Sequence, residues 1–237
     1  MADETNIVAA ERRRIQVEYQ RRETEIPADR YAPWQLAYLL ELSSRRRVAA
    51  SMLHRAGVFP GAGQRCLEVG FGPMGWLGDL ITWGVREVNL HGLELDAVRA
   101  QRARESLPMA DLRTGDATAI PWDSNTFGLV IASTVFSSIL DKSVRKMVAA
   151  EITRVLAPLG ALLWYDFAVD NPGNPNVAGV PKSEVRRLFP TLQGKIKSVT
   201  LAPPLARVVT PKSWFLASLL EAIPFLRTHL VGVLIKD

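Results

Sequence analysis

Three glycines at close spacing, directly after a short apolar run, constrain this chain more than any other feature. The run is Cys66–Val69, with Glu68 inside it, and the glycines are Gly70, Gly72 and Gly75. Glycine is required where φ is positive or where a side chain would meet a bound molecule. The segment therefore predicts a buried strand that turns sharply into a helix while its backbone stays open to a ligand.

The composition favours one large folded domain. Of the 237 residues, 48% are hydrophobic and 22% are charged, so a substantial core can form. The single cysteine excludes an internal disulfide and fits a thiol-reducing compartment. No apolar run approaches the roughly 18 residues of a membrane span, and the N-terminus lacks the basic-then-apolar pattern of a signal peptide. We therefore expect a cytoplasmic protein.

The net charge of +5 is concentrated near the C-terminus. Residues 180–237 carry nine Lys/Arg and three Asp/Glu, which gives this segment a charge of +6. Residues 61–179 carry 10 Lys/Arg and 13 Asp/Glu. A basic segment of this kind can meet an anionic partner such as phosphate, a lipid head group or nucleic acid, or it can be a solubilising surface. We favour the solubilising surface.

Residues 1–60 predict a helical N-terminal extension with helices at 5–26 and 34–56. The arginines of the first helix could suggest RNA binding. Because glutamates are interleaved with them, the pattern is more typical of a solvated helix with intrahelical ion pairs.

From residue 61 onward, short apolar segments alternate with helical segments. Strands are expected at 65–69, 87–93, 112–114, 127–132, 161–165, 195–201 and 229–235, and helices at 74–83, 96–106 and 144–156. This alternation predicts a parallel sheet with helices on both faces, which binds ligands beyond the carboxyl ends of its strands. We expect a single domain, 1–237, with a cofactor-binding core at 61–170 and C-terminal strands in 171–237.

Four motifs stand in a fixed order along this core. They are Glu68–Gly75, Gly92–Asp96, Gly115–Ala117 with the segments 120–122 and 125–130 after it, and Glu151–Gly160. Over residues 64–168 they resemble the class I S-adenosylmethionine-dependent methyltransferases, most closely the subgroup of quinone and small-molecule methyltransferases. The resemblance implies a Rossmann-like α/β fold, a seven-stranded sheet with an antiparallel last strand, and S-adenosylmethionine as cofactor with S-adenosylhomocysteine as product.

The resemblance also implies which residues bind the cofactor. Glu68 would receive its ammonium, Glu94 its two ribose hydroxyls and Asp116 its adenine amino group. The full set implied is Glu68, Gly70, Phe71, Gly72, Gly75, Glu94, Leu95, Asp116, Ala117, Ser133 and Thr134. A dinucleotide is the rival ligand, but Pro73 would deprive a phosphate cradle of a backbone N–H donor.

Two residues are candidates for the general base of methyl transfer. An antiparallel last strand starts at the edge where the parallel strands end, so His229 and Asp166 should meet at that edge. His229 is the first candidate because its ordinary pKa is near 6.5, and Asp166 is the second. The alternative is that His229 only caps its strand. The sequence contains no catalytic metal cluster, so we expect metal-independent chemistry.

The insertion at 202–228, between the last two strands, is both apolar and basic. It suits a lid over a bulky acceptor or a contact with a membrane surface. The alternative is a helix packed into the core or into a homodimer, and we favour that alternative.

The segments 163–167, 171–176, 201–207 and 223–229 resemble those of bacterial methyltransferases of polysaccharide and natural-product assembly. This second resemblance implies O-methylation of a sugar hydroxyl on a glycan or glycosylated metabolite. The acceptor would be bound by Phe136, Tyr165, Asn171, Asn174 and Arg207.

Three other functions stay open. Aromatic residues expected near the site favour a hydrophobic acceptor of the quinone or polyketide type. An RNA-binding protein is disfavoured, because motifs of the Asn-Pro-Pro-Tyr kind are absent and the basic charge is modest, so we expect no nucleic-acid partner. A non-catalytic partner subunit with the methyltransferase fold is disfavoured by the intact glycine turn and by the acidic residues after the first two strands.

Overall fold

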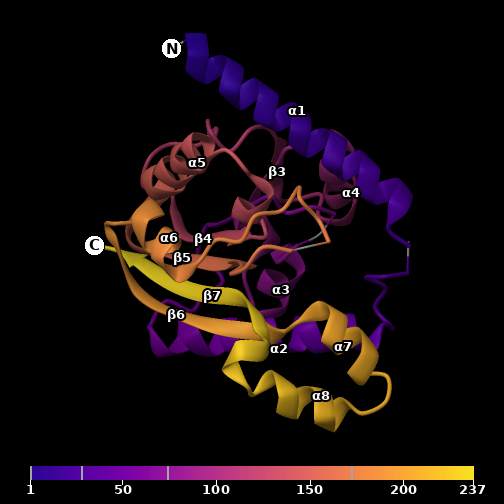
Figure 1. Ribbon diagram of the computed structural model, residues 1–237. Helices are drawn as coiled ribbons and strands as arrows, with labels where there is room; N and C mark the ends of the chain where they lie inside the picture. The colour runs from indigo at the N-terminus through magenta and orange to yellow at the C-terminus, as the bar shows by residue number, and fades with distance from the viewer. Residues whose placement is uncertain (1, 28, 74, 172) are drawn as a thin grey trace.

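A seven-stranded sheet lies at the centre of the computed structural model, which describes residues 2–27, 29–73, 75–171 and 173–237 (Figure 1). The strand order is β3-β2-β1-β4-β5-β7-β6. The strands are β1 (Cys66–Val69), β2 (Leu90–Glu94), β3 (Asp111–Thr114), β4 (Phe127–Ser133), β5 (Leu156–Phe167), β6 (Leu192–Leu201) and β7 (Arg227–Lys236). Neighbours pair in parallel from β3 to β5, and β7 runs antiparallel to both β5 and β6. The predicted sheet with an antiparallel last strand is confirmed.

Helices cover both faces of this sheet. The α-helices are α1 (Ala2–Glu25), α2 (Leu36–Arg55), α3 (Leu77–Thr82), α4 (Ala97–Ser106), α5 (Lys142–Val155), α6 (Lys182–Leu188), α7 (Pro203–Val209) and α8 (Trp214–Glu221), and the 3₁₀ helices are η1 (Glu87–Asn89), η2 (Phe136–Ser138) and η3 (Pro224–Leu226). Alternate side chains of β1 enter two separate cores. Cys66 belongs to the core shared with α2, α3 and α4, and Leu67 and Val69 belong to the core shared with α5 and α6.

The observed elements differ from the predicted ones mainly at their ends. The third helix starts at Leu77, because Gly75 and Trp76 remain in the loop; the predicted start, Met74, lies outside the described residues. The predicted strand at 161–165 begins earlier, because β5 starts at Leu156; within it Leu159 has a φ of +60° and the pairing with β4 shifts register. The short helix α6 was not predicted at all.

Helix α1 runs across the molecule past α4 and α5 (Figure 1). The predicted intrahelical ion pairs are present, with Arg14 and Arg21 each 2.7 Å from the glutamate three residues before it. Those glutamates, Glu11 and Glu18, are nevertheless buried. Glu11 accepts the backbone N–H of Leu140 at 2.5 Å, so the same acids attach α1 to the rest of the fold. The predicted solvated helix is therefore exposed along much of its length but buried at Glu11, Ile15 and Glu18.

The insertion between β6 and β7 forms α7, α8 and η3, which lie beside α2 (Figure 1). Ala206 of α7 and Ala217 of α8 share a small core with Leu40 of α2 and Leu201 of β6. Within the described ranges, none of the helices is long and apolar enough to cross a membrane.

Candidate functional site

The glycine turn after β1 adopts the backbone conformation that its sequence predicts. Gly70, Gly72 and Gly75 have φ values of +70°, +58° and +52°. A Cβ on Gly75 would lie 2.3 Å from Glu68 Oε1, whereas one on Gly72 would meet no described atom within 4 Å. Gly75 thus permits the turn itself, and among the described residues Gly72 faces open space in which a ligand can lie close to the backbone.

Glu68 holds this turn in place. Its Oε2 accepts the backbone N–H of Trp76 at 2.7 Å and that of Leu77 at 3.1 Å, so the carboxyl lies at the N-terminus of α3. Burial raises the pKa of Glu68 to about 8, although both N–H donors act in the opposite direction. The resemblance assigned this carboxylate to a cofactor ammonium. In the structure the carboxyl group is buried, and backbone N–H groups after the glycine turn donate hydrogen bonds to it.

Glu94 ends β2 and connects it to the same turn. Its Oε2 accepts the Gly72 N–H at 2.8 Å and its Oε1 accepts the Asp96 N–H at 3.0 Å. After β3, Asp116 Oδ1 accepts the backbone N–H and the hydroxyl of Thr118 at 2.9 and 2.8 Å. Both carboxylates therefore stand at the carboxyl ends of their strands, as predicted from the order of the motifs.

Phe71 does not present its side chain to this site. The ring is buried, and a Cβ on Gly92 would lie 2.4 Å from it, so Phe71 packs beneath the turn against β2. Leu95 and Ala117 are half-buried and pack against the core on the α5 face. At Phe71, therefore, only the backbone and not the side chain can face a ligand.

Helix α1 forms a cover over the end of β2 that the sequence did not reveal. Tyr19 packs against Arg99 of α4, whose guanidinium carbon lies 4.0 Å from the centre of the tyrosine ring. Burial raises the pKa of Tyr19 to about 12, and the charge of Glu94 acts in the same direction. Tyr19 and Leu95, the residue after β2, pack against the same core cluster. The apolar face that contains Tyr19 was visible in the sequence, but the surface it would cover was not.

The end of β4 adjoins β5 at Tyr165. Ser133 pairs with Tyr165 in the sheet, and the N–H of Thr134 donates to the Tyr165 carbonyl at 2.7 Å. Ser133 is buried and Thr134 is exposed. The predicted floor of the cofactor site is thus continuous with Tyr165.

The two predicted bases occupy opposite faces of the sheet and are both shielded. The His229 ring is 2% exposed, lies parallel to the Tyr165 ring at 5.0 Å and contacts Phe167 at 4.0 Å between centres. Burial lowers the pKa of His229 to about 3, and the nearby Arg45 charge acts in the same direction. His229 is therefore a neutral, stacked side chain. The prediction that it meets an acceptor as base is not supported by this geometry.

The Asp166 carboxyl accepts backbone hydrogen bonds and does not line the edge of the sheet. Its Oδ2 accepts the Ser137 N–H at 3.1 Å and its Oδ1 accepts the Phe167 N–H at 2.8 Å. Burial raises its pKa to about 6, although these hydrogen bonds lower it. The carboxyl secures η2 after β4, and because it is buried it cannot reach an acceptor in this conformation.

Three predicted acceptor residues also lie elsewhere. Phe136 is fully buried, with its ring centre 4.6 Å from that of Trp164, so it belongs to the core. Asn174 donates its side-chain N–H to Glu18 of α1 at 3.3 Å, and Asn171 accepts the Gly173 N–H at 3.0 Å. These asparagines shape a loop that secures α1 instead of lining a pocket.

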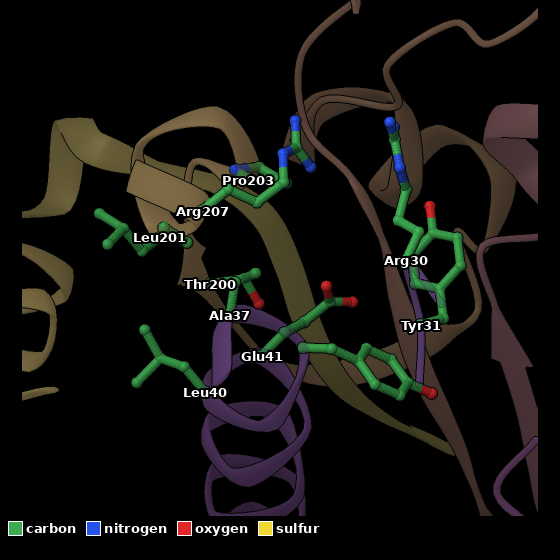
Figure 2. A pocket seen from close by; sticks show the side chains of 11 residues that line it. Arg30, Tyr31, Ala37, Leu40, Glu41, Thr200, Leu201, Pro203 and Arg207 are labelled. Carbon is green, nitrogen blue, oxygen red and sulfur yellow. The ribbon is translucent and has the colours of Figure 1, made fainter. Parts of the chain in front are cut away.

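A pocket does open between α2, the end of β6 and α7, and we call it the Glu41 pocket (Figure 2). It is lined by Arg30, Tyr31, Ala37, Tyr38, Leu40, Glu41, Thr200, Leu201, Pro203, Ala206 and Arg207. Figure 2 shows the Glu41 carboxylate projecting from α2 into the space between Arg207 and Tyr31. Burial raises the pKa of Glu41, while the Arg45 charge opposes that shift.

Tyr165 links the Glu41 pocket to the cofactor side. Its hydroxyl donates to Glu41 Oε1 at 3.4 Å and lies 3.0 Å from Thr200 Oγ1. Thr200 and Thr134, which flank Tyr165 from two strands, have φ values of +65° and +55°. Positive φ is strained for a β-branched residue, and such strain gathers at functional sites. The backbone is held out of its preferred region at the two points that contact Tyr165.

Sequence reasoning identified Tyr165 and Arg207 but missed Glu41, Thr200 and Tyr38. One signal was available: Glu41 is the only acidic residue in 30–60, and it interrupts the apolar run that begins α2. Nothing in the sequence placed that helix beside the end of β6.

Comparison with known proteins agrees with this geometry. Residues 66–160 match the family model described as "Methyltransferase domain". None of the curated protein sequences matches the chain.

Several solved structures share the fold. A putative sarcosine dimethylglycine methyltransferase from Galdieria sulphuraria aligns with a TM-score of 0.62 at 18% identity, covering 81% of this chain and 85% of the other. A geranyl diphosphate methyltransferase in complex with S-adenosylmethionine aligns with a TM-score of 0.60 at 15% identity, covering 81% of this chain and 85% of the other. An S-adenosylmethionine-dependent methyltransferase from Archaeoglobus fulgidus aligns with a TM-score of 0.58 at 14% identity, covering 84% of this chain and 99% of the other.

The described residues fit S-adenosylmethionine. Glu94 and Asp116 bring carboxyl groups to the carboxyl ends of β2 and β3, where a cofactor with ribose hydroxyls and an adenine amino group needs acceptors, while the buried Glu68 supports the glycine turn between them. The backbone beside Gly72 leaves room for it among the described atoms. With the domain matched over residues 66–160 and the shared fold, these features identify a methyltransferase domain with the fold of S-adenosylmethionine-dependent methyltransferases in this chain.

Proposed function

We propose that this methyltransferase transfers its methyl group to a hydroxyl oxygen that enters the Glu41 pocket, whose cavity of about 30 Å³ admits one polar group while the rest of the acceptor lies at its mouth. The observation that carries the proposal is the contact of Tyr165 with Glu41 and Thr200 at the inner end of that pocket. Tyr165 pairs with Ser133 of the cofactor floor, so the pocket and the cofactor side meet at one residue.

Glu41 is the general base in this proposal. A carboxylate whose pKa is raised by burial is a stronger base than an exposed one, and it can take the proton of an acceptor hydroxyl. Tyr165 positions it by donating to Oε1, and Thr200 can in turn donate to the tyrosine oxygen. When bound, S-adenosylmethionine supplies the methyl group from its sulfonium and becomes S-adenosylhomocysteine. The proton on Glu41 leaves through the mouth of the pocket.

We favour a sugar hydroxyl, on a glycan or glycosylated metabolite, as the acceptor. The rings of Tyr31 and Tyr38 meet edge to face at 5.6 Å beside Glu41, which gives an aromatic wall with polar tips. Arg30 and Arg207 add guanidinium donors at the mouth, which suit hydroxyl groups or an acidic group on a sugar. The proposal includes a thiol-reducing cytoplasmic setting, in line with the buried free thiol of Cys66.

A hydrophobic small molecule is the second candidate acceptor. Leu40, Leu201 and Ala206 form an apolar side of the pocket. One structural neighbour is named for geranyl diphosphate, a prenyl compound, and a similar acceptor would use that side.

The test is methyl transfer from labelled S-adenosylmethionine to an extract of a source strain that lacks this gene. Label in the aqueous phase supports a sugar or other polar acceptor, and label in the organic phase supports the hydrophobic candidate or a lipid-linked sugar. Hydrolysis of an organic-phase product separates these two, because only a lipid-linked sugar releases a labelled polar fragment.

The role of Glu41 has its own test. Glu41→Gln should lower kcat by about 100-fold or more and leave the Kd for S-adenosylmethionine unchanged. In the wild type, kcat/KM should rise with pH through a pKa above the ordinary range of a glutamate, since the base must be ionised. In the variant, kcat/KM should not show this rise. Glu105→Gln, on exposed α4, is the matched control. Full activity of Glu41→Gln would overturn the assignment.

A further inference from the structure

Helices α7 and α8 and the short η3 present an apolar surface that the rest of the described chain leaves open. We call it the α7–α8 face; it consists of Val208, Trp214, Phe215, Leu216, Leu219 and Phe225. Phe215 is 78% exposed and Phe225 is 84% exposed, whereas only Ala217 and Glu221 of α8 are buried. Of the favoured alternative, packing into the core applies only to the inner side of α8 at Ala217, and packing into a homodimer stays a prediction. Contiguous apolar exposure of this kind marks an interaction site.

Basic side chains border the α7–α8 face. A groove of about 600 Å³ runs between α2, β6 and α8, and Arg47, Lys197 and Trp214 line it. Arg47, Lys197 and Lys212 are exposed, and within the described ranges their side-chain nitrogens form no hydrogen bond or ion pair. Between residues 185 and 236 the only acidic residue is Glu221, which is buried. The surface is thus apolar and cationic together.

The framework that carries this face is fixed by Arg227. Its guanidinium donates to the carbonyls of Glu221 at 2.6 Å and Ala222 at 3.0 Å, where α8 ends, and to the Ser198 carbonyl of β6 at 3.1 Å. A cation suits the negative end of a helix. Because α8 is attached to the sheet in this way, its outward side chains are presented in one orientation.

We propose that the α7–α8 face docks the enzyme on an anionic lipid membrane. Phe215, Leu219 and Phe225 enter the boundary between head groups and acyl chains, and Trp214 lies at head-group level. Arg47, Lys197 and Lys212 face the lipid phosphates, and each cation near such a surface strengthens binding by about fivefold.

Charge separates this occupant from a second copy of the chain. A two-fold symmetric contact would place the α7–α8 face against itself. The basic residues at its border would then approach a second surface that also carries only cations among its exposed charges, which disfavours the contact unless anions intervene. A surface rich in lipid phosphate supplies those anions across the whole face.

Docking would also place the mouth of the Glu41 pocket beside the membrane. Arg207 and Pro203 of that mouth belong to α7, the helix that carries Val208. Membrane docking itself does not depend on the identity of the acceptor or on the role of Glu41.

Vesicle sedimentation with the full chain tests the proposal. Vesicles of phosphatidylcholine with phosphatidylglycerol should bind the protein, and those of phosphatidylcholine alone should bind it at least about tenfold more weakly, with the difference shrinking in high salt. Phe215→Ser combined with Phe225→Ser should weaken binding to anionic vesicles by about tenfold or more. Lys197→Gln with Lys212→Gln should weaken it by about 25-fold and leave neutral vesicles unaffected.

Leu159→Asn is the matched control. Leu159 is 76% exposed at the opposite edge of the sheet, and asparagine tolerates its φ of +60°. The Leu159→Asn variant should bind vesicles as the wild type does. All variants should keep the wild-type Kd for S-adenosylmethionine, which shows that they are folded. Absence of sedimentation with anionic vesicles would overturn the proposal. So would a dimer in analytical ultracentrifugation that Phe215→Ser dissociates, because a second copy would then cover the face.

Discussion

The cofactor side and the Glu41 side share one edge of the sheet but are held together differently. Glu68 contacts Trp76 eight residues later, and Glu94 contacts Gly72 across 22 residues. Tyr165, by contrast, contacts Glu41 across 124 residues. The first region is built from backbone groups of neighbouring segments, and the second from side chains of distant ones. A local motif can encode the first, whereas the second exists only when the whole chain has folded.

The largest effect is expected at Gly75. Gly75→Ala should lower the free energy of unfolding by about 4 kcal/mol, because its Cβ would lie 2.3 Å from Glu68 Oε1 at a φ of +52°. Gly72→Ala is the control: it has the same sign of φ but no described atom within 4 Å, so the loss should be about 1 kcal/mol. Urea unfolding measures both. Equal losses would show that the turn is not tightly packed and would remove one side of the comparison.

Asp166 follows Tyr165 on β5, between the two regions, and its ionisation should make the stability of the protein depend on pH. Its folded pKa is raised to about 6 from 3.8, so the folded state binds the proton more tightly and wild-type stability falls as pH rises through this range. Asp166→Asn lacks this titration. The stability difference should therefore shift in favour of the variant by about 3 kcal/mol between pH 3 and pH 8.

This shift is read from urea unfolding of wild type and variant at each pH, since the other carboxyl groups cancel in the difference. A difference that stays constant with pH would mean that Asp166 is ionised without penalty and is solvated in a way the fold does not suggest.

Gly72→Val should weaken cofactor binding and also lower stability by about 1–2 kcal/mol, because a β-branched residue is strained at a φ of +58°. The valine would occupy the space beside the turn and weaken S-adenosylmethionine binding by about 100-fold, or about 2.7 kcal/mol, in calorimetry. Gly57→Val offers a matched control, because its φ is +72° and again no described atom lies within 4 Å, but it follows α2 away from the site. If Gly72→Val bound the cofactor normally, the assignment of the turn would fail.

The smallest effect is expected at Tyr165. Tyr165→Phe keeps the ring stacked on His229 but removes the hydroxyl that positions Glu41, so kcat should fall by about tenfold, or about 1.4 kcal/mol, with the cofactor Kd unchanged. His229→Phe preserves the stack and should leave kcat within about twofold of the wild type. A larger loss in His229→Phe than in Tyr165→Phe would restore the histidine as a candidate base.

The sequence predicted the part of the site that depends on local contacts better than the part that depends on contacts between distant segments. The positions of Glu94 and Asp116 follow from strand ends, since an acid directly after a parallel strand must lie at the carboxyl edge. His229 and Asp166 were assigned to that edge by the same rule, but they are buried there. Strand position says where a residue lies along the sheet; it does not say what covers it.

The strand–helix alternation, the glycine turn and the acids at the strand ends could be predicted before folding was considered. Each depends on residue type and short spacing, which act through backbone conformation. The position of α1 beside the core next to β2, the approach of Glu41 on α2 to Tyr165 and the outward apolar side of α8 became visible only in the folded chain. These depend on which surfaces pack together over long sequence separations, and many pairings of apolar faces satisfy one hydrophobic pattern.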